Sequence, residues 1–106
     1  MKYRVILSPD AKTHVIAAVR WYQHSDPNVA SRFLDETGAM IRRIKQFPRG
    51  FQIFRGSIRR AVFRRFPYSI YFLLKIELAV VLAVLHHRQS DILRLGGDNG
   101  MAERGE

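Results

Sequence analysis

Two helix-start signals, Ser8-Pro9-Asp10 and Ser25-Asp26-Pro27, constrain the fold of this chain more than any other feature of its sequence. Ser and Asp are good helix N-caps, and Pro suits the first turn of a helix because an N–H there has no intrahelical partner. We therefore predict one helix that follows the first signal and ends near His24, and a second that ends before Phe47-Pro48-Arg49-Gly50. Because the turn between them is so short, the two helices must form an antiparallel hairpin.

The apolar residues of both predicted helices recur at spacings of three and four, which is the period of one helix face. Charged residues of the second helix fall mostly on its opposite side. Each helix is therefore expected to bury a single stripe, and the two stripes are Ala11, Val15, Ala18, Val19 and Tyr22, and Ala30, Phe33, Leu34, Thr37, Ile41 and Ile44.

The remaining apolar segments have the composition of β-strands. We predict strands at residues 2–7, 57–65, 68–74 and 78–86, with a tight connection at 75–77. The last three strands form an antiparallel meander. Its third strand, 78–86, is apolar on both faces, which is typical of a central strand that is covered on both sides. The predicted fold class is α+β: an N-terminal strand, an antiparallel helical hairpin, then a three-stranded antiparallel meander carrying the hairpin on one face.

Length and composition indicate one globular domain over residues 1–95 and a flexible Gly-rich tail over residues 96–106. The N-terminal apolar stretch is too short for a signal peptide, and the longest apolar run is far below the roughly 20 residues that span a bilayer. We therefore expect a cytoplasmic protein without membrane contact. The chain has no cysteine and no His, Asp or Glu set at metal-ligand spacing, so no metal or other cofactor is expected.

The net charge of +9 predicts an acidic partner, either a nucleic acid or an acidic protein segment. Arg59, Arg60, Arg64 and Arg65 lie in one predicted strand, and Arg55 precedes it. Strand alternation places Arg60 and Arg64 on one face and the other two on the opposite face. Because neighbouring like charges repel, we interpret these arginines as a binding surface for an acidic partner rather than a solvated sheet face.

His86 and His87 end the last predicted strand and are followed by Arg88. Adjacent strand residues face opposite ways, so the two histidines cannot share one small site, and each is predicted to be packed or hydrogen-bonded rather than catalytic. The few carboxylates form no evident acid–base pair, so any proton transfer would fall to these histidines or to a tyrosine.

Large aromatic side chains are expected to form the core and the packing of the hairpin. Trp21 lies beside the first helical stripe rather than in it, so it is expected in the core, with contact to a partner as the alternative. The set is Trp21, Tyr22, Phe33, Phe47, Phe51 and Phe54.

Short motifs along the chain resemble, in order and spacing, the RelE/ParE toxin superfamily and its ParE-like branch. The first motifs are Val5-Ile6-Leu7-Ser8-Pro9-Asp10-Ala11, Trp21-Tyr22, and Pro27 with Ala30-Ser31-Arg32-Phe33. The later motifs are Arg59-Arg60, Phe66-Pro67-Tyr68-Ser69-Ile70-Tyr71-Phe72, and Val81-Leu82-Ala83-Val84-Leu85-His86-His87-Arg88.

The resemblance implies a toxin of a type II toxin–antitoxin system, a class that includes plasmid-stabilisation systems. Such a toxin is held inactive by a cognate antitoxin whose acidic C-terminal segment wraps it, and it reaches operator DNA only through that antitoxin. An acidic segment of this kind would pair with exposed arginines. The candidate residues for binding the antitoxin or the target are Arg55, Arg59, Arg60, Arg64, Arg65 and Trp21.

Two branches with different targets share this fold. The RNA-cleaving branch places basic residues at alternate positions of the first meander strand, an arginine in the next strand, and a basic residue and a tyrosine near the C-terminus. This chain has Arg60 and Arg64 in the first of these strands, but Ser69 stands where the arginine is expected and no tyrosine follows Tyr71.

The Pro67-Tyr68 pair and the Leu85-His86-His87-Arg88 ending resemble the ParE branch, which poisons DNA gyrase without a nuclease site. We therefore predict a gyrase inhibitor rather than an enzyme. The first alternative is a ribosome-dependent messenger-RNA endoribonuclease with His86, His87 and Arg88 as candidate catalytic residues. The second is a non-toxic antitoxin-binding module that takes part in operon autoregulation.

Overall fold

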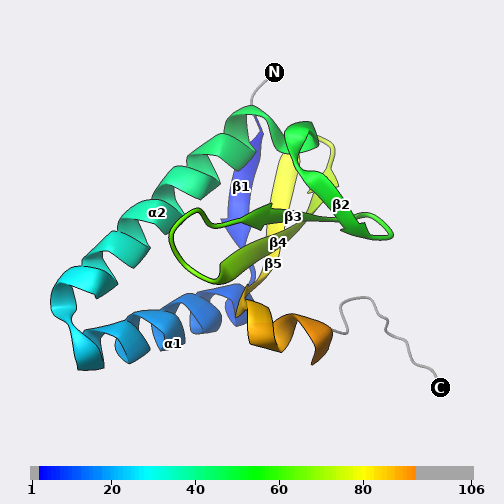
Figure 1. Cartoon of the computed structure of the whole chain (residues 1–106). Helices are drawn as coiled ribbons and strands as arrows, with labels where there is room; N and C mark the ends of the chain where they lie inside the picture. The colour runs from blue at the N-terminus through cyan, green and yellow to red at the C-terminus, as the bar shows by residue number, and fades with distance from the viewer. Residues whose placement is uncertain (1–2, 93–106) are drawn as a thin grey trace.

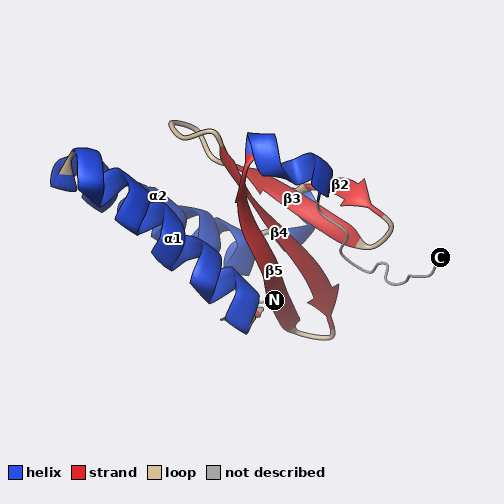
Figure 2. Ribbon diagram, turned by 90° about the horizontal axis from the view of Figure 1, so that it is seen from below, coloured by secondary structure: helices blue, strands red, loops and turns tan. Residues whose placement is uncertain are grey.

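A helical hairpin packs on one face of a five-stranded sheet (Figures 1 and 2). The computed structural model describes residues 3–92, and the predicted tail at 96–106 lies outside them. The elements are β1 (Arg4–Leu7), α1 (Pro9–Ser25), α2 (Pro27–Gln46), the 3-10 turn η1 (Pro48–Gly50), β2 (Gln52–Arg55), β3 (Ile58–Val62), β4 (Tyr68–Lys75), β5 (Leu78–His86) and the 3-10 helix η2 (His87–Ile92).

Both predicted helix starts are confirmed, and their caps connect local sequence to tertiary packing. The Ser8 hydroxyl accepts a hydrogen bond from the N–H of Ala11 (3.0 Å) and donates one to the carbonyl of Leu82 (3.1 Å), which ties the start of α1 to β5. The Asp26 carboxylate accepts from the N–H of Asn28 (2.9 Å) and so starts α2. The first helix ends at Ser25, and Asp26 alone separates it from the second.

The sheet has the strand order β1-β5-β4-β3-β2. The predicted antiparallel meander is present as β3, β4 and β5, and β1 joins the outer edge of β5 in parallel orientation. Residues 78–86, predicted to be central, are therefore an inner strand between β1 and β4, although the middle strand of the five is β4. The apolar composition of β5 reflects its place between two other strands with the hairpin over one face.

One strand, β2, was not predicted from the sequence. It pairs with β3 through a turn in which Gly56 adopts a positive φ of 54°, a conformation that favours glycine. The strand has only four residues, and three of them are exposed, so the alternating apolar pattern of a half-buried strand is missing. The following strand ends at Val62, so Arg64 and Arg65 lie in a loop and not in the predicted strand.

The core between hairpin and sheet is centred on Phe33, which is fully buried. Its ring stacks on Phe63 with centroids 5.3 Å apart and meets Tyr68 at 5.0 Å and Phe66 at 5.2 Å in edge-on geometry. Tyr22 of α1 joins the same cluster at 5.6 Å from Phe33. These contacts hold both helices against β4 and the loop that follows β3.

Three residues expected in the core are exposed. Trp21 is 71% exposed, Phe47 69% and Leu34 48%. Trp21 precedes the partly buried Tyr22 on α1, and Phe47 follows the last residue of α2. Helical spacing alone does not reveal these positions, because the width of the buried stripe depends on what packs against it.

A β-bulge in β5 decides which of its later side chains face the helices. Tyr71 pairs with Ala83 and Phe72 with Val81, so Leu82 is an extra residue. Val81 and Val84 both belong to the core under the hairpin, whereas Ala83 packs with Tyr71 on the open face. The bulge therefore shifts by one residue the alternation of side chains between the two sheet faces in the last part of β5.

None of the helices in the described part of the chain is both long and apolar enough to cross a membrane.

We expect Ser8→Ala to lower the free energy of unfolding by about 1–3 kcal/mol, because it removes an N-cap and a second hydrogen bond to β5. Urea denaturation monitored by circular dichroism measures this change. Ser31→Ala is the matched control, since Ser31 is exposed within α2, and its effect should stay within roughly 0.5 kcal/mol. Equal stability of the two variants would contradict the proposed role of the cap.

Candidate functional site

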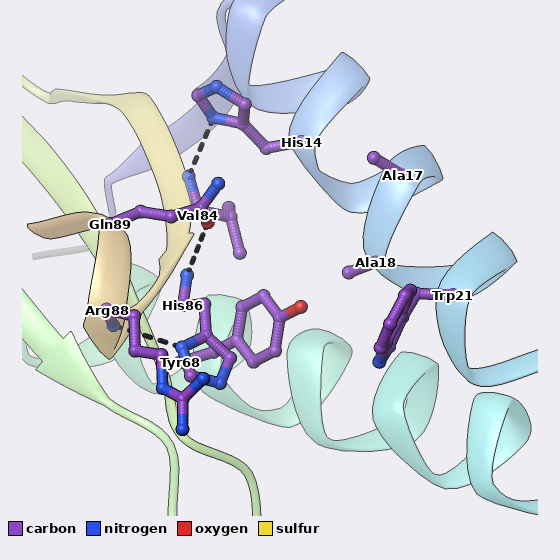
Figure 3. Close-up of a pocket in the computed structure, with 9 residues that line it drawn as sticks. All are labelled: His14, Ala17, Ala18, Trp21, Tyr68, Val84, His86, Arg88 and Gln89. Atoms are coloured by element: carbon purple, nitrogen blue, oxygen red, sulfur yellow. Dashed lines mark hydrogen bonds between the residues drawn. The ribbon is translucent and has the colours of Figure 1, made fainter.

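A hollow of about 380 Å³ lies where α1 passes the carboxyl end of β5 (Figure 3). Figure 3 shows residues of α1 on one side of it and His86, Arg88 and Gln89 on the other. Tyr68, the first residue of β4, lies between the two sides together with Val84.

The α1 side of the hollow consists of His14, Ala17, Ala18 and Trp21. These positions are spaced by three, four and seven residues, so they share one face of the helix. The two alanines leave open space beneath the rim, and the indole of Trp21 stands at that rim with most of its surface exposed. An exposed Trp beside a hollow is a typical anchor for a partner.

The second side is built by the turn from β5 into η2. The N–H of Arg88 donates to Nδ1 of His86 (3.0 Å), and the N–H of His86 donates to Oε1 of Gln89 (3.0 Å). The His86 ring also packs edge-on against Tyr68, with centroids 5.2 Å apart. Because Nδ1 is an acceptor, the neutral imidazole carries its proton on Nε2.

His14 connects α1 to β5, since its Nδ1 accepts a hydrogen bond from the N–H of Val84 (3.2 Å). Burial lowers the pKa of His14 from 6.5, although the nearby carboxylate of Asp10 acts in the opposite direction. Burial also raises the pKa of Tyr68, so its hydroxyl stays protonated and can donate. The polar groups of the hollow are thus mainly hydrogen-bond donors, and none of its described lining residues carries a carboxylate.

On the opposite, open face of the sheet, Arg60 lies directly across from Tyr71 in the ladder. Its guanidinium lies 5.3 Å from the centroid of the Phe54 ring. Within residues 3–92, the buried Nε of Arg60 and the buried hydroxyl of Tyr71 have no hydrogen-bond partner. Nε2 of His87 and the hydroxyl of buried Ser69 are 3.1 Å apart on the same face.

The two histidines therefore lie on opposite faces, as the sequence predicted. His86 faces the hollow, and His87 faces the open side with Ser69. The bulge in β5 decides this assignment. Arg88 borders the hollow with His86, so the three candidate catalytic residues do not gather at one point.

The five arginines expected to form one surface are divided between different parts of the fold. Arg59 faces the hairpin side and donates from Nη1 to the carbonyl of Phe51 (2.7 Å), which anchors the segment before β2. Arg55 is exposed on β2, with its guanidinium 5.4 Å from the Phe54 centroid. Only Arg55 and Arg60 share the neighbourhood of that ring.

Arg64 and Arg65 occupy the loop between β3 and β4, where their backbone N–H groups donate to the carboxylate of Glu36. This contact fixes the loop against α2 and leaves both arginine side chains exposed. Sequence reasoning assigned no role to Glu36 or His14. The i, i+7 spacing of His14 and Trp21 was the available signal for the hollow, but it does not show what lies opposite.

Across the described residues, no group of three or more His, Asp or Glu side chains is arranged to hold a metal ion.

Comparison with known proteins places these features in a family. Residues 5–91 match a family model described as the ParE toxin of the type II toxin–antitoxin system parDE. A solved structure titled as a chromosomal ParDE TA system from P. aeruginosa superposes with a TM-score of 0.71. That match covers 80% of this chain and 96% of the other, at 15% sequence identity, and so shows a shared fold. No curated protein matches the sequence significantly.

The lowered pKa of His14 predicts a pH-dependent stability. In the unfolded chain His14 binds a proton near pH 6.5, whereas in the folded chain it does so only at a lower pH. The contribution of neutral His14 to the free energy of unfolding is therefore fully present above pH 6.5 and is lost as the pH falls below 6.5. Urea unfolding at several pH values between about 5.5 and 7.5 measures this decrease in the free energy of unfolding. The decrease toward low pH should be smaller in His14→Asn than in the original chain, and the amide oxygen of this variant can still accept from the N–H of Val84.

His24→Asn is the control. If both substitutions made the decrease smaller by the same amount, the assignment to His14 would be contradicted.

Proposed function

The chain belongs to the ParE toxin family of type II toxin–antitoxin systems, and from this premise we propose that it inhibits DNA gyrase and is neutralised by a cognate antitoxin. The observation that carries the choice of target is Ser69. It stands where the resemblance to the RNA-cleaving branch would place an arginine, and it is fully buried against His87. A buried serine cannot provide the positive charge that stabilises a phosphate in RNA cleavage.

An acidic antitoxin is supported by the charge of the chain. The net charge is +9, and Arg55, Arg64 and Arg65 are exposed. Carboxylates of a partner would form charge-assisted hydrogen bonds with such side chains and speed the encounter. The similar solved structure is itself titled a ParDE system, so we assign the same kind of pairing to this chain. Operator DNA would then be reached through the antitoxin.

The proposed site of action is the cytoplasm, because gyrase acts there. The exposed arginines that the antitoxin does not cover are candidates for contact with the target. Arg60, which is half-buried on the open sheet face, is a further candidate.

We expect the purified protein to inhibit supercoiling by gyrase and to increase the amount of cleaved DNA in the same reaction. Agarose-gel assays of plasmid topology measure both effects over a range of protein concentrations. Addition of the protein encoded by the adjacent reading frame should restore supercoiling. Normal supercoiling at saturating toxin would contradict gyrase as the target, and absence of growth arrest on expression would favour a non-toxic module.

The open face also supports a second candidate function, a ribosome-dependent endoribonuclease. Arg60 and His87 share this face, and the buried Nε of Arg60 has no hydrogen-bond partner among residues 3–92. An arginine of this kind can hold a phosphate and stabilise the charge that develops on it.

The combined substitution of His86→Ala, His87→Ala and Arg88→Ala tests the endoribonuclease candidate. If the chain cleaves messenger RNA, the triple variant should lose cleavage of translated message by at least about 100-fold, the scale of general acid–base catalysis. Primer extension on message from cells expressing each protein measures the cut sites. Cleavage that is unchanged in a folded triple variant would exclude these residues as the catalytic set.

A further inference from the structure

The hollow beside α1 combines an exposed aromatic rim with an apolar floor of small residues. Trp21 stands at the rim, and Ala18 and Val84 are buried beneath it. A volume of about 380 Å³ is at the small end of the range for ligand pockets, about 300–1,000 Å³. The space therefore suits one large apolar side chain of a partner better than an extended cofactor.

The polar groups around this floor attract negative charge. Arg88 is an exposed cation, and His14 and His86 both use Nδ1 to accept backbone N–H groups, so each neutral ring has its N–H at Nε2. Gln89 adds an amide, and the lining residues that the structure describes include no Asp or Glu, the described carboxylate near His14 being that of Asp10 on the same helix. The complementary ligand has an apolar side chain with carboxylates next to it.

We propose that this hollow is the docking site of an acidic, amphipathic segment of the antitoxin, with Trp21 as the anchor and Arg88 as the partner of a carboxylate. The inference rests on the proposed pairing with an antitoxin and adds where on the toxin that pairing is anchored. A large apolar side chain of the segment enters between Trp21 and Tyr68. Its flanking carboxylate reaches the guanidinium of Arg88.

The arginines near β3 are less suited to anchor such a segment. Arg59 already donates to the carbonyl of Phe51, and Arg60 lies against the ring of Phe54 with its Nε buried. Arg64 and Arg65 are exposed but lie on a loop whose backbone is fastened to Glu36. Arg64 and Arg65 also border a larger hollow of about 650 Å³, but Asp35 and Glu36 line it as well and offset their positive charge. These arginines can therefore steer an acidic partner, whereas the hollow beside α1 combines an unopposed cation with a recess for an apolar group.

Titration of the full chain with the purified protein of the adjacent reading frame tests the proposal. Trp21→Ala should raise the dissociation constant at least about 30-fold, which is the effect of losing a hot-spot residue. Arg88→Glu should raise it about tenfold or more. The matched controls are Phe47→Ala and Arg49→Glu, which change an equally exposed aromatic residue and an exposed arginine just after α2. Both variants should bind within about threefold of the original chain.

Photocrosslinking identifies the occupant directly. A benzoylphenylalanine residue at Ala17, which lines the hollow, should crosslink to an acidic segment of the partner, and the same residue at exposed Ile53 on β2 should not. A crosslink from Ala17 to residues 93–106 of this chain, or to a second copy, would overturn the proposal. Failure of the unmodified chain to bind the partner at all contradicts the proposed pairing, whereas tight binding that is unaffected by Trp21→Ala and Arg88→Glu contradicts the docking site alone.

Discussion

The packing of Phe33 against the aromatic residues of the sheet side is the contact on which the rest of the structure depends. Its ring touches Phe63, Phe66 and Tyr68, and through Tyr22 the same cluster includes α1. Truncation of a fully buried Phe costs about 3–5 kcal/mol, a large share of the roughly 5–15 kcal/mol that stabilises a small domain. Without this cluster the hairpin would have no fixed position, and the hollow between α1 and β5 would not exist.

A bulge in β5 and two hydrogen bonds between α1 and β5 then decide which side chains lie on each face of the sheet. The bulge at Leu82 directs His86 to the hairpin side and His87 to the open face, which gives each histidine a separate environment. The hydrogen bonds of Ser8 and His14 to β5 hold α1 at the edge of the hollow. The helix that carries Trp21 is thus already positioned before a partner arrives, which lowers the entropy cost of binding.

In the function that we propose, the positive charge of the chain attracts a partner from a distance and also pairs with it in direct contact. Exposed arginines distributed over β2 and the loop after β3 attract an acidic partner from a distance, and salt weakens this attraction. Contact at the hollow would then provide specificity, because it needs an apolar side chain and a carboxylate in a defined arrangement. This division explains why arginines that are spread over the fold can still serve one partner.

Local sequence by itself determined the helical hairpin, the meander and the α+β class, because caps, prolines and apolar periods act within a few residues. Short motifs also indicated the toxin family over most of the chain. Tertiary structure alone decided that β2 completes the sheet, that Trp21 is exposed and that the arginines separate. It also decided which histidine borders the hollow. These features depend on residues far apart in sequence, since one extra residue in β5 changes which face a side chain meets and only packing shows which helix face remains uncovered.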